Sequence, residues 1–245
     1  MKNLLGRAGL ATLRRFARQR VLLAFDYDGT LAPIVRDPEA ADMRPRTRTL
    51  LAEVARRYPC VVVSGRARAD VMKKVARLPL RAVLGNHGME PWPGLAAARG
   101  RARRWRARLR ATLPPMPGIF LEDKGPSLAL HYRRAKAPAR ARRLVLAAVA
   151  DLPGARIVGG KMVVNLLPAN APNKGTALLG LRRRLHCAAI IYVGDDDNDE
   201  DAFALAGQVP LLGIRVGRSR RSRATCFLPG QPAVDELLSL LVKMR

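Results

Sequence analysis

Two short stretches of this 245-residue chain concentrate acidic side chains. Asp26 and Asp28 are one residue apart, and six of the seven residues from Asp195 to Asp201 are acidic. Carboxylates this close repel one another unless a proton or a cation lies between them. Oxygen ligands suit a hard divalent cation, but the spacing and glycine of an EF-hand calcium loop are absent. The acidic residues therefore predict a divalent metal site, most simply for Mg²⁺.

Three further polar residues stand at expected turns or helix starts. Ser64 precedes Gly65 and Arg66, and Lys174 follows Asn173 at the start of an expected helix. Ser64 could serve only as the N-cap of the next helix. A lysine at a helix N-terminus is poorly placed for the helix dipole unless an anion binds there. His87, between Asn86 and Gly88, indicates a tight turn with close backbone approach.

Short apolar runs stand directly before most of these residues. Such runs, bounded by turn residues, are typical of buried parallel strands. The expected core strands are 21–25, 60–63, 82–84, 188–193 and 211–216. The expected core helices are 44–57, 68–78, 176–185 and 233–242, and a basic surface helix is expected before residue 21. Ligands of an open α/β sheet bind beyond the carboxyl ends of its strands, where the acidic residues fall.

The pattern changes after Pro91 and Pro93. The following segment predicts helix–strand–strand–helix–strand–strand, a compact α+β unit. The expected elements are helices 95–113 and 139–152 and strands 119–122, 127–133, 156–158 and 162–167. We therefore predict an α/β protein: a Rossmann-like parallel-sheet core, residues 1–90 and 168–245, with an inserted α+β cap, residues 91–167. Such a cap would exclude water and add substrate contacts.

The chain carries 45 Lys and Arg against 19 Asp and Glu, a formal charge of +26. Arginine runs lie at 99–110, 133–143, 182–184 and 215–223. One explanation is nucleic-acid binding through phosphate contacts. The other is solvated helix faces, which the scattered positions and scarce interleaved aromatics favour. In either case the field attracts anionic substrates.

The three cysteines, Cys60, Cys187 and Cys226, are far apart and show no metal-binding spacing. They predict reduced, mostly buried thiols in a cytoplasmic protein. No apolar run is long enough to span a membrane. The basic N-terminus could be a transit-like segment, but it lacks a sustained apolar stretch and a clear cleavage site, so a helix is expected there. We expect a monomer.

The segment DYDGTL, residues 26–31, resembles the first signature of the haloacid dehalogenase-like phosphatases, D-x-D-G-T-L. Ser64, Lys174 and the run after Val193 resemble the other three signatures, in the family's order. The resemblance implies that Asp26 attacks phosphorus and that Asp28 is the general acid and base. It further implies that Ser64, Lys174, Gly29, Thr30, Gly65 and Arg66 serve the phosphoryl group. The implied metal-site residues are Asp26, Asp28, Asp195, Asp196 and Asp199.

Further segments resemble the trehalose-6-phosphate phosphatase family within that superfamily. They are GNHGME at 85–90, the E-x-K and H-Y-R pattern within 122–133, GKMVVNLLP at 160–168, and GDDDNDEDAF at 194–203. The resemblance implies that the following residues bind substrate: Asn86, His87, Gly88, Glu122, Lys124, His131, Arg133, Lys161 and Asn165. Asn165 stands where the family pattern has Glu, so its side chain is neutral.

These resemblances imply a Mg²⁺-dependent phosphoric monoester hydrolase that converts trehalose 6-phosphate to trehalose and phosphate. Asn165 keeps open a phosphatase for another sugar phosphate of the superfamily, such as sucrose phosphate or a mannosyl-phosphoglycerate. A basic nucleic-acid-binding protein is the alternative from a different class. The expected partner is a small sugar phosphate, with no membrane and no nucleic acid.

Overall fold

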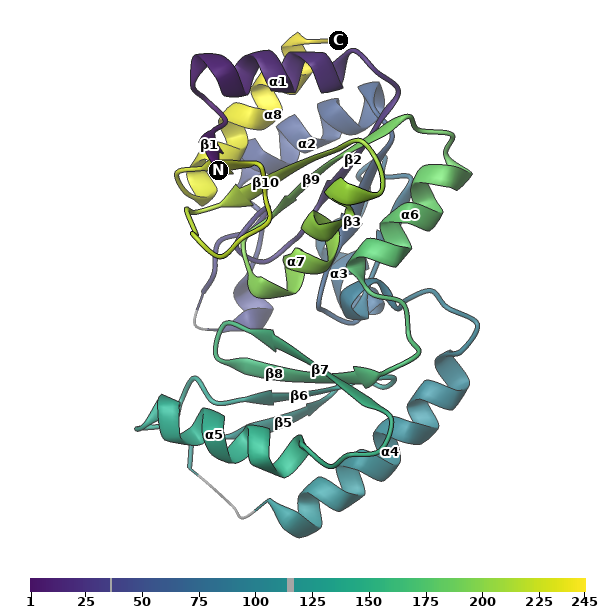
Figure 1. Cartoon of the computed structure of the whole chain (residues 1–245), viewed down its shortest axis with the longest axis vertical. Coiled ribbons are helices and arrows are strands. Elements are labelled where there is room, and N and C mark those ends of the chain that lie inside the picture. The colour runs from purple at the N-terminus through teal and green to yellow at the C-terminus, as the bar shows by residue number, and fades with distance from the viewer. Residues whose placement is uncertain (36, 114–116) are drawn as a thin grey trace. The chain divides into compact units, whose positions relative to one another are not determined.

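A computed structural model describes residues 1–35, 37–113 and 117–245 of the protein (Figure 1). The chain forms two compact units. Unit 1 comprises Met1–Gly88 and Asn173–Arg245, and unit 2 comprises Met89–Pro172. The sequence predicts these boundaries at 90/91 and 167/168, and the role of the inserted unit as a substrate cap stays a prediction.

Unit 1 is built on a seven-stranded sheet in which every neighbouring pair is parallel. Its strands are β1 (Lys2–Asn3), β2 (Val21–Phe25), β3 (Cys60–Val63), β4 (Ala82–Leu84), β9 (Ala189–Gly194), β10 (Leu211–Val216) and β11 (Cys226–Leu228). Its α-helices are α1 (Arg7–Ala17), α2 (Pro45–Arg57), α3 (Arg68–Lys74), α6 (Lys174–Arg184), α7 (Glu200–Phe203) and α8 (Val234–Lys243). The fold class predicted from the sequence is confirmed.

The order of strands places a topological switch point in the middle of the sheet. The order is β1-β11-β10-β9-β2-β3-β4, so the chain moves from β2 outward through β3 and β4, and later continues from β9 in the opposite direction. Phe25 of β2 pairs with Val193 of β9, which brings the carboxyl ends of these two strands level. A crevice at such a point is the usual ligand site of an open α/β sheet.

Helices cover both faces of this sheet, which explains why its strands are apolar on both sides. On one face, Leu23 and Phe25 belong to a core that includes residues of α1, α2 and α8. On the other face, Leu22 and Ala24 pack in a second core with residues of α6 and α7. All five residues of β2 are buried, so the strand that carries Asp26 is fixed from both sides.

Unit 2 contains an antiparallel sheet with the strand order β5-β6-β8-β7. Its elements are α4 (Leu95–Thr112), β5 (Phe120–Asp123), β6 (Leu128–His131), α5 (Pro138–Val149), β7 (Ala155–Gly160) and β8 (Val163–Pro168). Helices α4 and α5 pack on one face of the sheet, over a core that includes Trp105, Leu130 and Val145. The helix–strand–strand–helix–strand–strand order expected from the sequence is the order observed.

Most differences from the expected elements are shifts of one to three residues at their ends. The largest concerns the helix expected over 68–78, which ends at Lys74. Arg77 adopts a left-handed backbone conformation with φ of 64°, which a continuing α-helix cannot contain. Within residues 1–35, 37–113 and 117–245, no helix combines the length and the hydropathy needed to cross a bilayer.

Candidate active site

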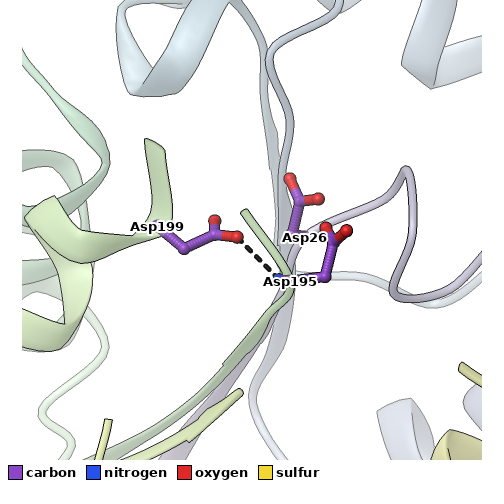
Figure 2. A group of neighbouring side chains, drawn as sticks. All are labelled: Asp26, Asp195 and Asp199. Carbon is purple, nitrogen blue, oxygen red and sulfur yellow. Dashed lines mark hydrogen bonds between the residues drawn. The ribbon is translucent and has the colours of Figure 1, made fainter. Parts of the chain in front are cut away.

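Two buried carboxylates stand at the adjacent carboxyl ends of β2 and β9. Asp26 follows β2 directly, and its N–H donates to the carbonyl of Val193 at 2.8 Å. Asp195 follows β9, and both side chains are almost fully buried. Figure 2 shows the carboxylates of Asp26 and Asp195 side by side, with that of Asp199 pointing toward the Asp195 backbone. The strand register thus brings together acids that are 169 residues apart in the sequence.

Lys174 reaches this acidic group from the first turn of α6. Its Nζ donates to Asp26 Oδ1 at 2.8 Å and to Asp199 Oδ1 at 2.6 Å, and the side chain is 1% exposed. Asn173 caps the helix by accepting the N–H of Thr176, which fixes the backbone at Lys174. Lys174 is therefore hydrogen-bonded to the predicted nucleophile, Asp26. Sequence spacing alone could not predict this contact.

Asp199 uses both of its oxygens to organise the loop after β9. Oδ1 accepts the Tyr192 hydroxyl at 2.6 Å as well as Lys174. Oδ2 accepts the backbone N–H groups of Asp195, at 2.8 Å, and Asp196, at 2.9 Å. Four hydrogen bonds to one fully buried carboxylate compensate for the water that it loses on burial.

The neighbouring charges shift the pKa values in this cluster. Burial raises the pKa of Asp26; Lys174 opposes this shift, and Asp199 and Asp195 add to it. For Lys174, burial alone would lower the pKa, but the charges of Asp199 and Asp26 outweigh it and raise the pKa. Lys174 is therefore a cation at neutral pH. One cation faces three carboxylates, and the mutual repulsion of the carboxylates favours binding of a further positive charge.

The donor set of this cluster fits a hard divalent cation. Asp26, Asp195 and Asp199 each offer an oxygen within 4.8 Å of the others, and all three are buried. With Lys174 counted, the group carries a formal charge of −2, which one divalent ion neutralises. An all-oxygen donor set suits Mg²⁺ and not the softer metals.

The close approach of Asp195 to the first signature requires the glycine at position 29. Gly29 has a φ of +80°, and a Cβ there would overlap the Asp195 carboxylate. Next to it, Thr30 is fully buried, and within the described residues its Oγ1 has no hydrogen-bond partner. The backbone of the D-x-D-G-T segment thus turns sharply next to the Asp195 carboxylate, and Gly29 makes that turn possible.

Asp28 lies outside the group of three and is bound by arginine. Arg66 donates through Nε and Nη2 to the two oxygens of Asp28, both at 2.8 Å, and through Nη1 to Asp70 at 2.8 Å. This paired geometry fixes the direction of both planar groups. Asp196 also has another structural task, because its side chain accepts the N–H of Asp197 at 2.8 Å. Metal binding by Asp28 and Asp196 stays a prediction.

Ser64 and the turn 86–88 form a second part of the site. Ser64 follows β3, is fully buried and accepts the N–H of Arg66 at 3.1 Å. The N–H of His87 donates to the Ser64 carbonyl at 2.9 Å. Asn86, His87 and Gly88 have successive positive φ values of 46°, 59° and 92°. A Cβ on Gly65 would meet the His87 ring, so that glycine permits the packing.

The remaining predicted substrate residues belong to unit 2. His131 Nε2 lies 2.7 Å from Glu122 Oε2, and Lys124 Nζ lies 3.8 Å from the same oxygen. Arg133 Nη2 donates to the Lys161 carbonyl at 3.3 Å. Asn165 is buried in β8, and its Nδ2 donates to the Val158 carbonyl at 3.4 Å. The structure therefore groups these residues on β5, β6 and β8 and in the turns that adjoin the strands. Their role toward a substrate stays a prediction.

Sequence reasoning missed two residues that hold the site in place. Tyr192, on β9, donates to Asp199 and was hidden within an apolar strand. Arg215, at the end of β10, was counted only as part of a basic run. Its Nη1 donates to the Asp196 carbonyl and to Glu200 Oε1, both at 3.1 Å, and the residue is 9% exposed. A basic residue inside a predicted strand, level with an acidic loop, is the signal that could have identified it.

The trehalose-phosphatase family model matches residues 24–228. This chain belongs to the trehalose-phosphatase family. A curated trehalose-phosphate phosphatase of Mycobacterium tuberculosis is 35% identical over 234 residues, which cover 89% of this chain and 59% of the relative. One of Mycobacterium marinum is 34% identical, with 87% and 59% covered. The chain thus spans about three fifths of the length of these curated relatives.

Solved structures agree with the family membership. The C-terminal domain of a Candida albicans trehalose-6-phosphate phosphatase matches with a TM-score of 0.81 and 25% identity, and the match covers 100% of both chains. A sucrose-phosphatase of Synechocystis matches with a TM-score of 0.58 at 16% identity, over 91% of this chain and 98% of that one. The second likeness shows a shared fold alone. The family resemblance of the sequence motifs is confirmed.

Proposed function

We propose that this trehalose-phosphatase family member hydrolyses trehalose 6-phosphate to trehalose and inorganic phosphate. One observation carries the proposal: Asp26, at the end of a buried strand, is bonded through Oδ1 to the buried ammonium of Lys174. Within the described residues its other oxygen, Oδ2, accepts no hydrogen bond. A carboxylate anchored by one oxygen, with the other available, suits nucleophilic attack.

In the proposed reaction, Asp26 Oδ2 forms a bond to phosphorus while the bond from phosphorus to the sugar oxygen breaks. Asp28 donates a proton to that leaving oxygen, which releases trehalose and leaves an aspartyl-phosphate. Asp28 then accepts a proton from water, whose oxygen attacks phosphorus and frees Asp26 and phosphate. Lys174 and the Ser64 hydroxyl stabilise the negative charge on the phosphoryl oxygens.

The carboxylates of Asp26, Asp195 and Asp199 would hold Mg²⁺, which would supply Lewis-acid stabilisation of the phosphoryl oxygens. The other roles in this proposal rest on side chains of the protein. Burial of Asp26, Lys174 and Ser64 limits the water around them, which strengthens their electrostatic interactions with an anionic ester. Arg66 fixes the orientation of Asp28 until the substrate is bound.

Unit 2 carries the surface that we propose binds the sugar. Register places Phe120, Glu122, Ala129, His131 and Asn165 on the sheet face opposite α4 and α5, because Leu128 and Leu130 point toward those helices. Phe120 is 64% exposed, and its ring centroid lies 6.1 Å from that of His131. An exposed aromatic ring beside a hydrogen-bonded Glu–His pair suits a sugar, which has apolar ring faces and polar edges.

We also propose a cytoplasmic monomer. The three cysteines are buried and unpaired within the described residues, which supports a reducing compartment. The curated relatives are longer than this chain, so we propose the phosphatase activity for this chain by itself.

The deciding experiment measures phosphate release from trehalose 6-phosphate, glucose 6-phosphate and sucrose 6-phosphate, with and without Mg²⁺. We expect Mg²⁺-dependent release with the highest kcat/KM for the trehalose ester, and none from the folded Asp26→Asn variant. Preference for a different ester would overturn the substrate and direct attention to Asn165, which is neutral where the family pattern is acidic. Turnover by Asp26→Asn at the rate of the natural chain would overturn the covalent route.

A further inference from the structure

Unit 2 carries a large positive charge that has no role in the proposed reaction. Its residues 89–172 include sixteen Lys and Arg and only four Asp and Glu. Seven of the arginines lie on α4 and three on α5. Neither helix, each described over its full length, contains an aspartate or glutamate. Because α4 and α5 cover the same face of the sheet, one side of this unit gathers ten arginines.

The arginines of α4 form two rows. Residues three and four apart share a helix face, so one row contains Arg99, Arg103, Arg106 and Arg110, and the other contains Arg101, Arg104 and Arg108. The buried stripe of the helix, Ala98, Ala102, Trp105 and Leu109, lies between the rows on the core side. On the solvent side the rows are separated by small residues, Ala96, Gly100 and Ala107. The solvent side of α4 therefore presents two rows of arginines with a ridge of small side chains between them.

Few of these charges are compensated within the protein. Arg106 pairs with Asp123, and Arg101 donates to Asn170. In the part of the chain that the structure describes, Arg99, Arg103, Arg104, Arg108 and Arg110 are exposed and make no ion pair. Like charges three and four residues apart destabilise a helix. This repulsion persists in the free protein and would be relieved by a partner with regularly spaced negative charges.

We propose that α4 binds duplex DNA by lying in the major groove, with its two arginine rows on the phosphates of the two strands. The 18-residue helix is about 27 Å long and about 10–12 Å across, which fits a groove about 12 Å wide. The ridge of Ala and Gly allows close approach but offers no group that reads base edges, so the binding is independent of sequence.

Other polyanions fit these features less well. A membrane-surface helix needs an apolar face to insert among lipids, and the apolar face of α4 is buried in the core of unit 2. The major groove of double-stranded RNA is too deep and narrow for a helix. Single strands are usually bound on exposed aromatic side chains, and the one aromatic residue of α4, Trp105, is buried.

The test compares two triple variants that lose the same charge. One replaces Arg99, Arg103 and Arg110 with Gln, and the control replaces Arg46, Arg56 and Arg183, which are exposed helix arginines of unit 1. Fluorescence anisotropy with a labelled duplex measures Kd from about 50 to about 200 mM salt. We expect the α4 variant to reduce the slope of log K against log salt by about three, and the control to reduce it by less than one.

Four results would overturn the proposal: no binding by the natural chain at about 50 mM salt, equal losses in the two variants, tighter binding to a single strand, or tighter binding to anionic vesicles. The α4 variant should keep the phosphate release of the natural chain, because its substitutions lie on the helix layer and not on the sugar-facing sheet. Its melting temperature should equal or exceed that of the natural chain, since like-charge pairs are removed, so lost binding cannot be ascribed to unfolding.

Discussion

At the scale of single residues, the site depends on side chains that orient other side chains. Asp199 accepts four hydrogen bonds, two of which hold the backbone around Asp195. Arg215 supports the same loop from the neighbouring strand through the Asp196 carbonyl and Glu200. Glu200 in turn accepts the N–H of Arg223 at 2.8 Å, so the loop is tied to two segments. Arg215 and Glu200, which are not among the proposed metal ligands, thus help to set the positions of the acids.

We predict that Arg215→Gln weakens Mg²⁺ binding by about 10- to 100-fold, the usual cost of losing a partner behind the metal ligands. The loop would lose two hydrogen bonds from a buried guanidinium, and Glu200 would lose its ionic partner. Calorimetric titration with Mg²⁺ measures the effect directly.

Arg215→Lys should recover part of the affinity, because it restores the charge without the forked geometry. Arg218→Gln is the matched control, since Arg218 is exposed and its guanidinium stacks on Phe227 away from the loop. The KM for the sugar phosphate should stay unchanged at saturating Mg²⁺. An unaltered Mg²⁺ affinity in Arg215→Gln would contradict the positioning role.

At the scale of elements, the proposed catalytic groups stand at strand ends of unit 1, and the proposed sugar-binding groups lie on one face of the unit 2 sheet. Parallel strands β2, β3 and β9 bring a carboxylate, a hydroxyl and an acidic loop to one edge of the unit 1 sheet. In unit 2, alternation along β5 and β6 sends apolar residues toward α4 and α5 and sends Phe120, Glu122 and His131 to the opposite face. The cost of this arrangement is an exposed phenylalanine, which a bound sugar would cover.

We predict that Phe120→Ala raises KM for trehalose 6-phosphate roughly tenfold, because covering much of an exposed aromatic ring is worth about 1.5 kcal/mol. The kcat should change little, since the role proposed for Phe120 is to bind the sugar and not the phosphoryl group. Steady-state kinetics with the trehalose ester and with a small phosphate ester separate the two effects.

Ile157→Ala serves as the control for Phe120→Ala. Ile157 is 40% exposed and lies on the same sheet, but it pairs with Leu166, whose side chain points toward the helices. Its loss should leave KM unchanged. Equal KM values for Phe120→Ala and the natural chain would remove Phe120 from the sugar surface.

At the scale of the whole molecule, a strongly basic protein keeps a locally acidic centre. The formal net charge is +26, whereas Asp26, Asp195, Asp199 and Lys174 together have a formal charge of −2. The surrounding positive field draws anionic esters toward the protein. The acidic cluster repels such esters unless a divalent cation is present, which links substrate binding to metal binding.

We predict that Mg²⁺ at about 100 times its Kd stabilises unit 1 by about 2.7 kcal/mol. The corresponding rise in melting temperature is roughly 5–10 °C for a protein of this size. Differential scanning calorimetry in Mg²⁺ and in a chelator measures it. Asp195→Asn should abolish most of the rise, and an equal rise in that variant would place the metal elsewhere.

The sequence alone determined the order of most elements and placed the acidic residues at strand ends. Apolar runs ending in Asp26, Ser64 and Asp195 were sufficient to predict parallel strands and a shared edge, because strand polarity places all carboxyl ends together. The inserted unit was predicted from the change after Pro91. These features depend on short-range patterns, which a single chain displays without any knowledge of its contacts.

Only the tertiary structure decided which groups touch. The bonds from Lys174 to Asp26 and Asp199, the Arg66 clamp on Asp28 and the roles of Tyr192 and Arg215 all join segments that sequence spacing does not relate. The sequence shows the arginines of α4 as a run of charges, but it does not show which face of the helix is buried in the core. Helix periodicity gives the rows, whereas packing against the sheet determines which of them remain exposed.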